Sequence, residues 1–202
     1  MDKKTQFQEW QKELYALNNQ IKEAYRDKKL RNDLAQNRRK LSQKAIKLVG
    51  ESEIASWMKN PFSSETIYFA EFLGYFAADS ELSTSQIRNS FGEVKRIQMN
   101  AMAYQNESMY LNSTDMMSFR MLVPKLSYAA ARSKKEGTDK FKEVMAICIG
   151  AVIEEIELQK SKSKEEDKSP ETNDNINKIN PFENFTNFFE AILAYHKTAG
   201  GD

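Results

Sequence analysis

The sequence predicts an all-α protein built from long amphipathic helices. Apolar residues recur at steps of three and four along most of the chain, which is the spacing of one buried helix face. The 202 residues include only 7 glycines and 4 prolines, too few to punctuate a sandwich or barrel of many short strands. Hydrophobic residues make up 40% and charged residues 29%, which suits a helical protein with a hydrated surface.

The first predicted helix carries a heptad seam of nearly three repeats, which is marginal for an independent coiled coil. Two interpretations are open. Either the seam packs on the protein's own bundle or a neighbouring subunit, or the chain is a coiled-coil adaptor that binds protein partners. The seam consists of Phe7, Trp10, Leu14, Leu17, Ile21 and Ala24.

Residues 26–47 are strongly basic. They hold nine lysines and arginines against two aspartates, a surplus of seven positive charges. This segment is either a solvated helix or a helix that reaches along an RNA backbone or a neighbouring subunit, with Arg38, Arg39 and Lys40 as candidate contacts. Residues 1–60 are therefore expected to form a basic N-terminal helical extension. Its packed side is expected to consist of Leu30, Leu34, Leu41, Ala45 and Leu48.

Residues 61–159 are expected to form the core of the helical bundle. An aromatic-rich helix follows Pro61 and is capped by Ser63 or Ser64. Its aromatic residues are expected to pack in the core or at a protein interface rather than stack on bases. They are Tyr68, Phe69, Phe72, Tyr75 and Phe76.

Three long helices follow in this core. The first begins at Ser83, which forms a capping box with Gln86. The second contains Pro124, which removes a helical hydrogen bond and predicts a kink or a restart. The expected spans are about 83–107, 114–135 and 138–159.

The first two of these helices each show a buried stripe and a separate basic face. On the first helix, Gly92 interrupts the basic row. It either lets a strand or helix approach closely, or permits tight packing inside the bundle. The two basic faces together are expected to line a shallow channel for a phosphate backbone. The faces consist of Thr84, Arg88, Gly92, Lys95 and Arg96 on the first helix, and of Met121, Lys125, Tyr128 and Arg132 on the second.

The C-terminal part combines a polar segment with an aromatic helix. Residues 160–180 are nearly free of large apolar groups and are expected to be a flexible polar linker. Residues 181–202 are expected to form a helix that packs on the core, starting after Asn180 and ending at Gly200.

The sequence predicts no enzyme, with no catalytic residue, cofactor or metal site. His196 is the only histidine and is expected to cap carbonyls or pack in the bundle. Cys148 is expected to be a buried apolar residue. The glutamates near residue 155 are expected to be solvated, and the chain has no Walker loop or dinucleotide-binding glycine motif.

Location and charge limit the class of partner. No apolar run reaches the roughly 18 residues that a membrane span needs, and the N-terminus lacks the apolar core of a signal peptide. We therefore expect a cytoplasmic protein without a membrane partner. The net charge is only +1, so any nucleic-acid site must be a local patch.

Three blocks in the last 120 or so residues resemble one known family. They read LSTSQIRNSFGEVKRIQ, LVPKLSYAAAR and NFTNFFEAILAYHKTAGG. In this order they are similar to the signature blocks of the small subunit of type III-A CRISPR Csm effector complexes. The resemblance covers about residues 80–200, whereas residues 1–75 have no clear counterpart and residues 160–180 look like an insertion.

The resemblance implies a compact bundle of about five helices over residues 80–200, present in several copies per complex. The copies would stack on one another along the guide RNA–target RNA duplex, beside the backbone and large subunits, without cutting RNA. It also implies RNA-binding residues, although Ala131 stands where the family usually has glycine. These residues are Arg88 in TSQIR, Lys95 and Arg96 in GEVKR, Lys125 in PKL and Arg132 at the end of the second block. Such contacts to phosphates carry no sequence information, which suits a subunit that serves any guide.

Overall fold

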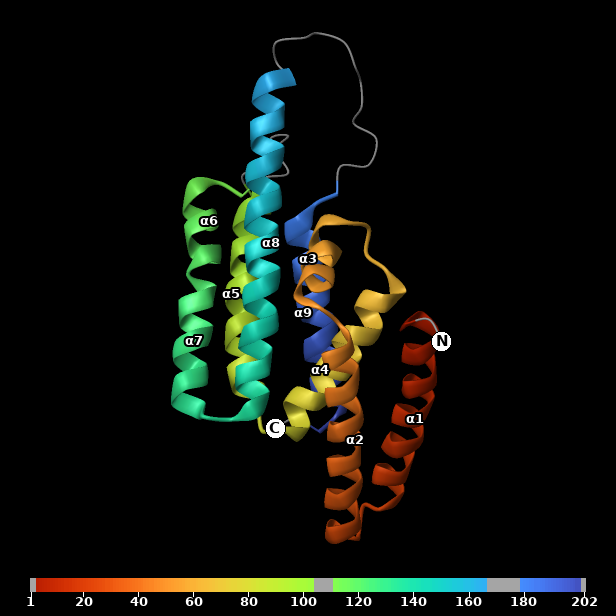
Figure 1. Ribbon diagram of the computed structural model, residues 1–202. Coiled ribbons are helices and arrows are strands. Elements are labelled where there is room, and N and C mark those ends of the chain that lie inside the picture. The colour runs from red at the N-terminus through yellow and green to blue at the C-terminus, as the bar shows by residue number, and fades with distance from the viewer. Residues whose placement is uncertain (1–2, 104–110, 167–178, 201–202) are drawn as a thin grey trace.

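The computed structural model describes residues 3–103, 111–166 and 179–200, and all regular structure in these ranges is helical (Figure 1). The all-α prediction is confirmed. In the same ranges no helix is long and apolar enough to cross a membrane. The helices are α1 Lys3–Glu23, α2 Lys28–Leu48, α3 Glu51–Lys59, α4 Ser64–Asp79, α5 Thr84–Ala103, α6 Ser113–Arg120, α7 Leu122–Ser133, α8 Glu136–Glu166 and α9 Pro181–Thr198.

Helices α1 and α2 form an antiparallel hairpin that projects past the rest of the molecule at the lower right of Figure 1. Asp27 caps α2 by accepting a hydrogen bond from the Leu30 amide. On the seam of α1, Phe7 and Leu14 are fully buried. The Phe7 ring lies 5.8 Å from that of Phe72 on α4. The heptad seam therefore packs on the protein's own bundle.

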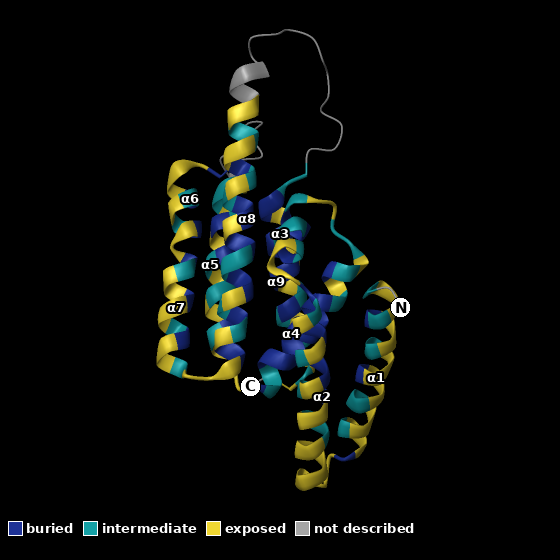
Figure 2. Cartoon of the chain, viewed as in Figure 1, coloured by how far each residue is buried: buried dark blue, intermediate teal, exposed yellow. Residues whose placement is uncertain are grey.

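Helices α4 and α9 cross at the centre of the molecule, where Figure 2 shows continuous burial. A Cβ atom at Gly74 would lie 2.7 Å from the Tyr195 Cβ and 2.8 Å from the Ile192 carbonyl oxygen, so only glycine allows this approach. The rings of Phe69 and Phe188 stack nearby at 6.2 Å. Of the five aromatic residues of α4 predicted to pack in the core or at an interface, Phe69, Phe72, Tyr75 and Phe76 are buried, and Tyr68 is half-buried against the core.

Helices α5 to α8 form the other side of the bundle, at the left of Figure 1. The predicted capping box begins α5: Gln86 accepts from the Ser83 amide at 3.1 Å, and the Gln86 amide donates to the Ser83 hydroxyl at 3.3 Å. The predicted break at Pro124 takes the form of a restart. Helix α6 ends at Arg120, and Pro124 lies in the first turn of α7, where its missing N–H is not needed.

The segment between α8 and α9 differs in part from the prediction. Helix α8 continues to Glu166, although a polar linker was expected from residue 160. The lysines and glutamates there have good helix propensity and extend a helix that the core has already nucleated. Residues 167–178, the rest of the expected linker, and residues 104–110, the expected end of the first long helix, lie outside the described residues. Asn180 caps α9 as predicted, accepting from the amides of Phe182 and Glu183.

Candidate nucleic-acid interface

The outer face of α5 is open around Gly92. No atom of the described residues outside the helix's own backbone lies within 4 Å of the position that a Cβ would take there. The interpretation that Gly92 permits tight packing inside the bundle is therefore wrong. Arg88 and Arg96 are exposed on either side of it. Thr84, which the sequence placed on this face, is instead buried, at 6% exposure.

The polar face of α7 is exposed as predicted. Lys125 and Arg132 both face water, and Tyr128 on the same side is 70% exposed. The opposite stripe is buried, with Leu122 and Leu126 at 3% and 6% exposure. Both helices thus have the two-sided character that their spacing predicts.

A single carboxylate joins two of the candidate cations across α5 and α7. Glu93 accepts from the Arg96 guanidinium at 2.9 and 3.2 Å and from the Lys125 ammonium at 3.2 Å. The hydrogen bonds from Arg96, aided by Lys125, lower the pKa of Glu93 to about 2, so it is ionised at neutral pH. Glu93 is not among the residues that the sequence predicts for this face. Its place three residues before Arg96 on one helix was a usable signal.

Lys95 lies on a different side of α5. Its ammonium is 3.1 Å from Glu190 on α9 and 5.2 Å from the centre of the Phe91 ring. The structure therefore brings Arg96 and Lys125 together but directs Lys95 toward α9.

Arg88 and Arg132 lie at the same end of the α5–α7 pair. The two helices run antiparallel in Figure 1, and Glu93 contacts Lys125 between them. Arg88 is five residues before Glu93, and Arg132 is seven residues after Lys125. At about 1.5 Å per residue, both arginines lie about 7–11 Å from that contact in the same direction. Neither makes an ion pair or hydrogen bond within the described part of the chain.

We define the α5–α7 face as Arg88, Gly92, Arg96, Lys125, Tyr128 and Arg132. Exposed methionines continue it toward α6, with Met99, Met102 and Met117 each at least 60% exposed. The helical spacing placed Met121 on this side but did not single out Met99, Met102 or Met117, since an exposed methionine has no sequence signal that separates it from a buried one. The face therefore has a basic end, at Arg88 and Arg132, and a methionine-rich end.

A protein-family comparison assigns the chain. The model described as Csm2 Type III-A matches residues 60–165 and 170–202, which hold the whole α5–α7 face. The chain belongs to the Csm2 Type III-A family. It is thus a small subunit of a type III-A CRISPR complex, as the three sequence blocks indicated. No curated protein and no solved structure matches it.

Helices α1 and α2 lie outside the range matched by the Csm2 family. On α2 the structure corrects the expectation of a row of exposed phosphate contacts. Arg38 is 4% exposed and forms a two-bonded ion pair with Asp79, at 2.8 and 2.6 Å. Arg39 donates to the Ser80 hydroxyl at 2.8 Å and pairs with Glu136. Because both arginines join helices, only Lys40 of the predicted three faces water without such a role.

Three side chains of kinds that enzymes commonly use are buried or paired in this chain: His196, Cys148 and Glu154. His196 is fully buried, with its Nε2 2.7 Å from the Leu82 carbonyl oxygen, and burial lowers its pKa. Burial likewise raises the pKa of the Cys148 thiol. Glu154 pairs with Lys59 at 2.5 Å. The described residues contain no group of three or more histidine, cysteine or acidic side chains placed to hold a metal.

Proposed function

We propose that the chain is a non-catalytic RNA-binding subunit whose α5–α7 face contacts the guide RNA–target RNA duplex through phosphates. Several copies would stack along the duplex, beside the backbone and large subunits of the complex. Membership of the Csm2 family supports a place in a type III-A CRISPR complex. The RNA contact is proposed mainly because Arg88 and Arg132 are both exposed at one end of the face. Within the described residues, no acidic side chain pairs with either of them.

The chemistry of the face favours phosphate. Arg96 uses two of its five N–H donors on Glu93, and Lys125 uses one of three, so both keep donors for a second acceptor. Gly92 leaves the backbone open between Arg88 and Arg96. A phosphate backbone can lie along such a surface without presenting its bases, and base pairing then supplies the sequence discrimination.

The alternative function, a coiled-coil adaptor, would need the heptad seam of α1 to be exposed to a partner. Phe7 and Leu14, which would form the seam, are 0% exposed because α2 and α4 of the same chain cover them. A protein partner would have to displace the protein's own helices. We therefore favour the RNA-binding role.

The test is the double variant Arg88→Ala/Arg132→Ala. Both side chains are exposed, so the free energy of unfolding should change by less than about 0.5 kcal/mol. Losing two phosphate contacts should lower the slope of log affinity against log salt by about 1.4 for single-stranded RNA. Filter binding at several salt concentrations measures this, first with the free chain and then with the assembled complex, where more phosphates are covered.

The matched control is Lys12→Ala/Lys44→Ala, which removes two exposed charges from α1 and α2. The control should keep both the slope and the affinity within error of the unsubstituted protein. An Arg88→Ala/Arg132→Ala protein that binds RNA like this control, in the complex as well as alone, would exclude the α5–α7 face as the RNA contact.

A further inference from the structure

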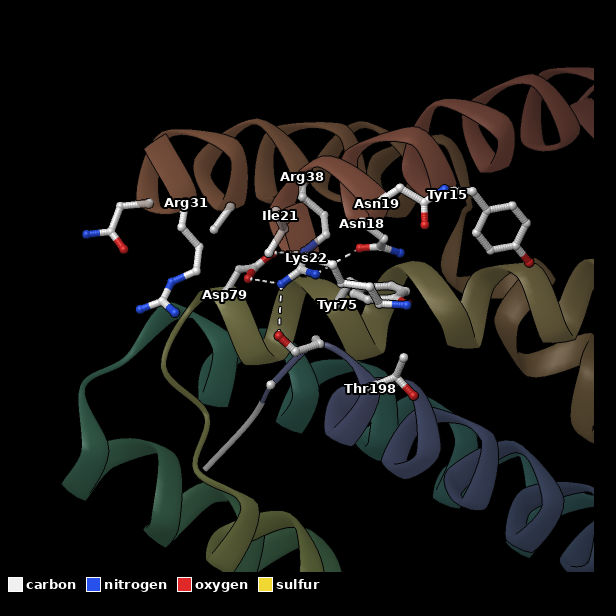
Figure 3. Close-up of a pocket in the computed structure, with 14 residues that line it drawn as sticks. Tyr15, Asn18, Asn19, Ile21, Lys22, Arg31, Arg38, Tyr75, Asp79 and Thr198 are labelled. Carbon is white, nitrogen blue, oxygen red and sulfur yellow. Dashed lines mark hydrogen bonds and ion pairs between the residues drawn. The ribbon is translucent and has the colours of Figure 1, made fainter. Parts of the chain in front are cut away.

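A polar cleft of about 740 Å³ lies where the α1–α2 hairpin meets the ends of α4 and α9 (Figure 3). This volume falls within the range of about 300–1,000 Å³ that is usual for pockets that bind small molecules. We call it the hairpin cleft. Its walls include Lys22, Arg31 and Arg38 as cations and Asp79 as the one acidic residue, which leaves a surplus of two positive charges.

The floor of the hairpin cleft is fixed and electrically balanced. Arg38 reaches from α2 to Asp79 on α4, and it also donates to the Asn18 side chain at 2.8 Å and to the Ala199 carbonyl oxygen at 3.0 Å (Figure 3). Its guanidinium lies 4.8 Å from the centre of the Tyr75 ring. The carboxylate of Asp79 is thus already held by Arg38, so it does not offset the charges at the rim.

The rim of the cleft, in contrast, presents free donors. Lys22 and Arg31 are exposed, and neither side chain forms an ion pair or hydrogen bond within the described ranges. Asn19 and Asn32, also exposed, add side-chain amides to the same walls. An ammonium, a planar guanidinium and amide N–H groups are donors that suit phosphate oxygens, and because they lie around the hollow on both sides of Arg38 they can contact different phosphates of one strand (Figure 3).

We propose that the hairpin cleft is a second phosphate-binding site, which holds an RNA strand by its backbone. The inference rests on the proposed function only in taking RNA as the ligand. The cleft residues are separate from the α5–α7 face, and the two free cations, Lys22 and Arg31, lie outside the family match. RNA is taken as the ligand because the chain belongs to a family of small subunits of type III-A CRISPR complexes. The exposed Lys29, Lys40, Lys44 and Lys47 do not line the hairpin cleft, because at 3.6 residues per turn they lie on the outer side of α2, roughly opposite the buried Arg38.

The experiment compares three double variants of the full chain with a single-stranded RNA oligonucleotide. Lys22→Gln/Arg31→Gln alters the hairpin cleft. Lys12→Gln/Lys44→Gln removes the same charge from the same two helices but does not touch the cleft. Arg88→Gln/Arg132→Gln alters the α5–α7 face. Melting curves check that each protein is folded.

The cleft variant should lower the salt slope by about 1.4. Its loss of affinity between about 50 and about 200 mM salt should then be about 7-fold smaller than that of the unsubstituted chain. The control, Lys12→Gln/Lys44→Gln, should leave the slope within error of the unsubstituted chain. The effects of the cleft and the face should add when the two double variants are combined, because separate sites act independently.

The outcomes separate the two proposals. If only the face variant weakens binding, the hairpin cleft is not an RNA site and the proposed function stands. If only the cleft variant does so, the α5–α7 face is excluded and the cleft remains. An RNA affinity of the unsubstituted chain that does not respond to salt would overturn both. Competition by a poly-glutamate peptide as strong as that by RNA of equal charge would point to an acidic protein ligand and would overturn the cleft proposal.

Discussion

The strongest test of the architecture is to break the ion pair that anchors the N-terminal hairpin. Arg38→Met keeps the aliphatic stem and removes the guanidinium, leaving Asp79 buried at 7% side-chain exposure without its partner. Removing one member of a buried pair costs about 3–5 kcal/mol. The free energy of unfolding of a natural domain is about 5–15 kcal/mol, so this loss would be a large share of the total. The melting temperature should fall by about 2–4 °C for each kcal/mol.

The pH dependence of this loss has a definite sign. Burial raises the pKa of the Asp79 carboxyl, and the hydrogen bonds and charge of Arg38 oppose that rise. Without Arg38 the pKa rises further, so the folded state takes up a proton more readily than the unfolded chain. The destabilisation of Arg38→Met should therefore be largest near neutral pH and shrink as the pH falls and Asp79 becomes protonated.

Urea unfolding followed by far-UV circular dichroism measures these changes. Lys40→Met is the matched control on the same helix, and as an exposed substitution it should stay within about 0.5 kcal/mol of the unsubstituted protein. In a double-mutant cycle, Arg38→Met/Asp79→Leu should lose less than the sum of the two single variants, by up to about 3 kcal/mol. An Arg38→Met loss below about 1 kcal/mol, or an additive cycle, would refute the reasoning.

Further predictions concern single positions and the last helix. Glu93→Gln should cost at most about 1 kcal/mol of stability, as for a surface ion pair, yet strengthen RNA binding by freeing the two cations that it bridges; weaker or unchanged binding by filter assay would count against the face. Burial raises the pKa of Glu71 above its ordinary value of 4.5, so the stability gained from its protonated form is complete below about pH 4.5 and is lost as the pH rises through the folded-state pKa. Glu71→Gln should therefore make the urea midpoint depend less on pH in that range. Gly74→Ala should destabilise by about 1–3 kcal/mol, because its methyl group would meet the Tyr195 Cβ at 2.7 Å, and a melting temperature within error of the unsubstituted protein would contradict the close crossing. Deletion of residues 181–202 should give an aggregating or partly unfolded product, whereas a soluble truncation with an unchanged melting temperature would show that the last helix is an independent motif.

The helices could be predicted from the sequence because burial follows local spacing. The stripe that runs from α6 into α7 shows this clearly: Phe119, Leu122 and Leu126, at steps of three and four, are all buried. The helix starts at Ser83 and Asn180 were also predictable, since a cap depends on side chains within three residues. Fold class and element type therefore follow from local sequence here.

The roles of individual cations could not be predicted, because the deciding partner lies far away in the sequence. Arg38 and Asp79 are 41 residues apart, and Lys95 and Glu190 are 95 apart. The sequence of α2 shows a surplus of positive charge, but it does not show which of those side chains pair with residues on other helices. The same limit applies to Gly74, whose necessity depends on the residue that α9 brings opposite it.

The net charge of +1 does not show that the cations have two different roles, which become visible only in the fold. Some hold helices together, as Arg38 does between α2 and α4 and Lys95 does between α5 and α9. Others, such as Arg88, Arg132 and Arg31, have no described acidic partner. Because water-exposed charges act within about 10 Å at ordinary ionic strength, affinity for a polyanion depends on where the unpaired cations gather and hardly on the total. A substitution that removes a paired cation should therefore cost stability first, whereas one that removes an unpaired cation should cost salt-dependent binding first.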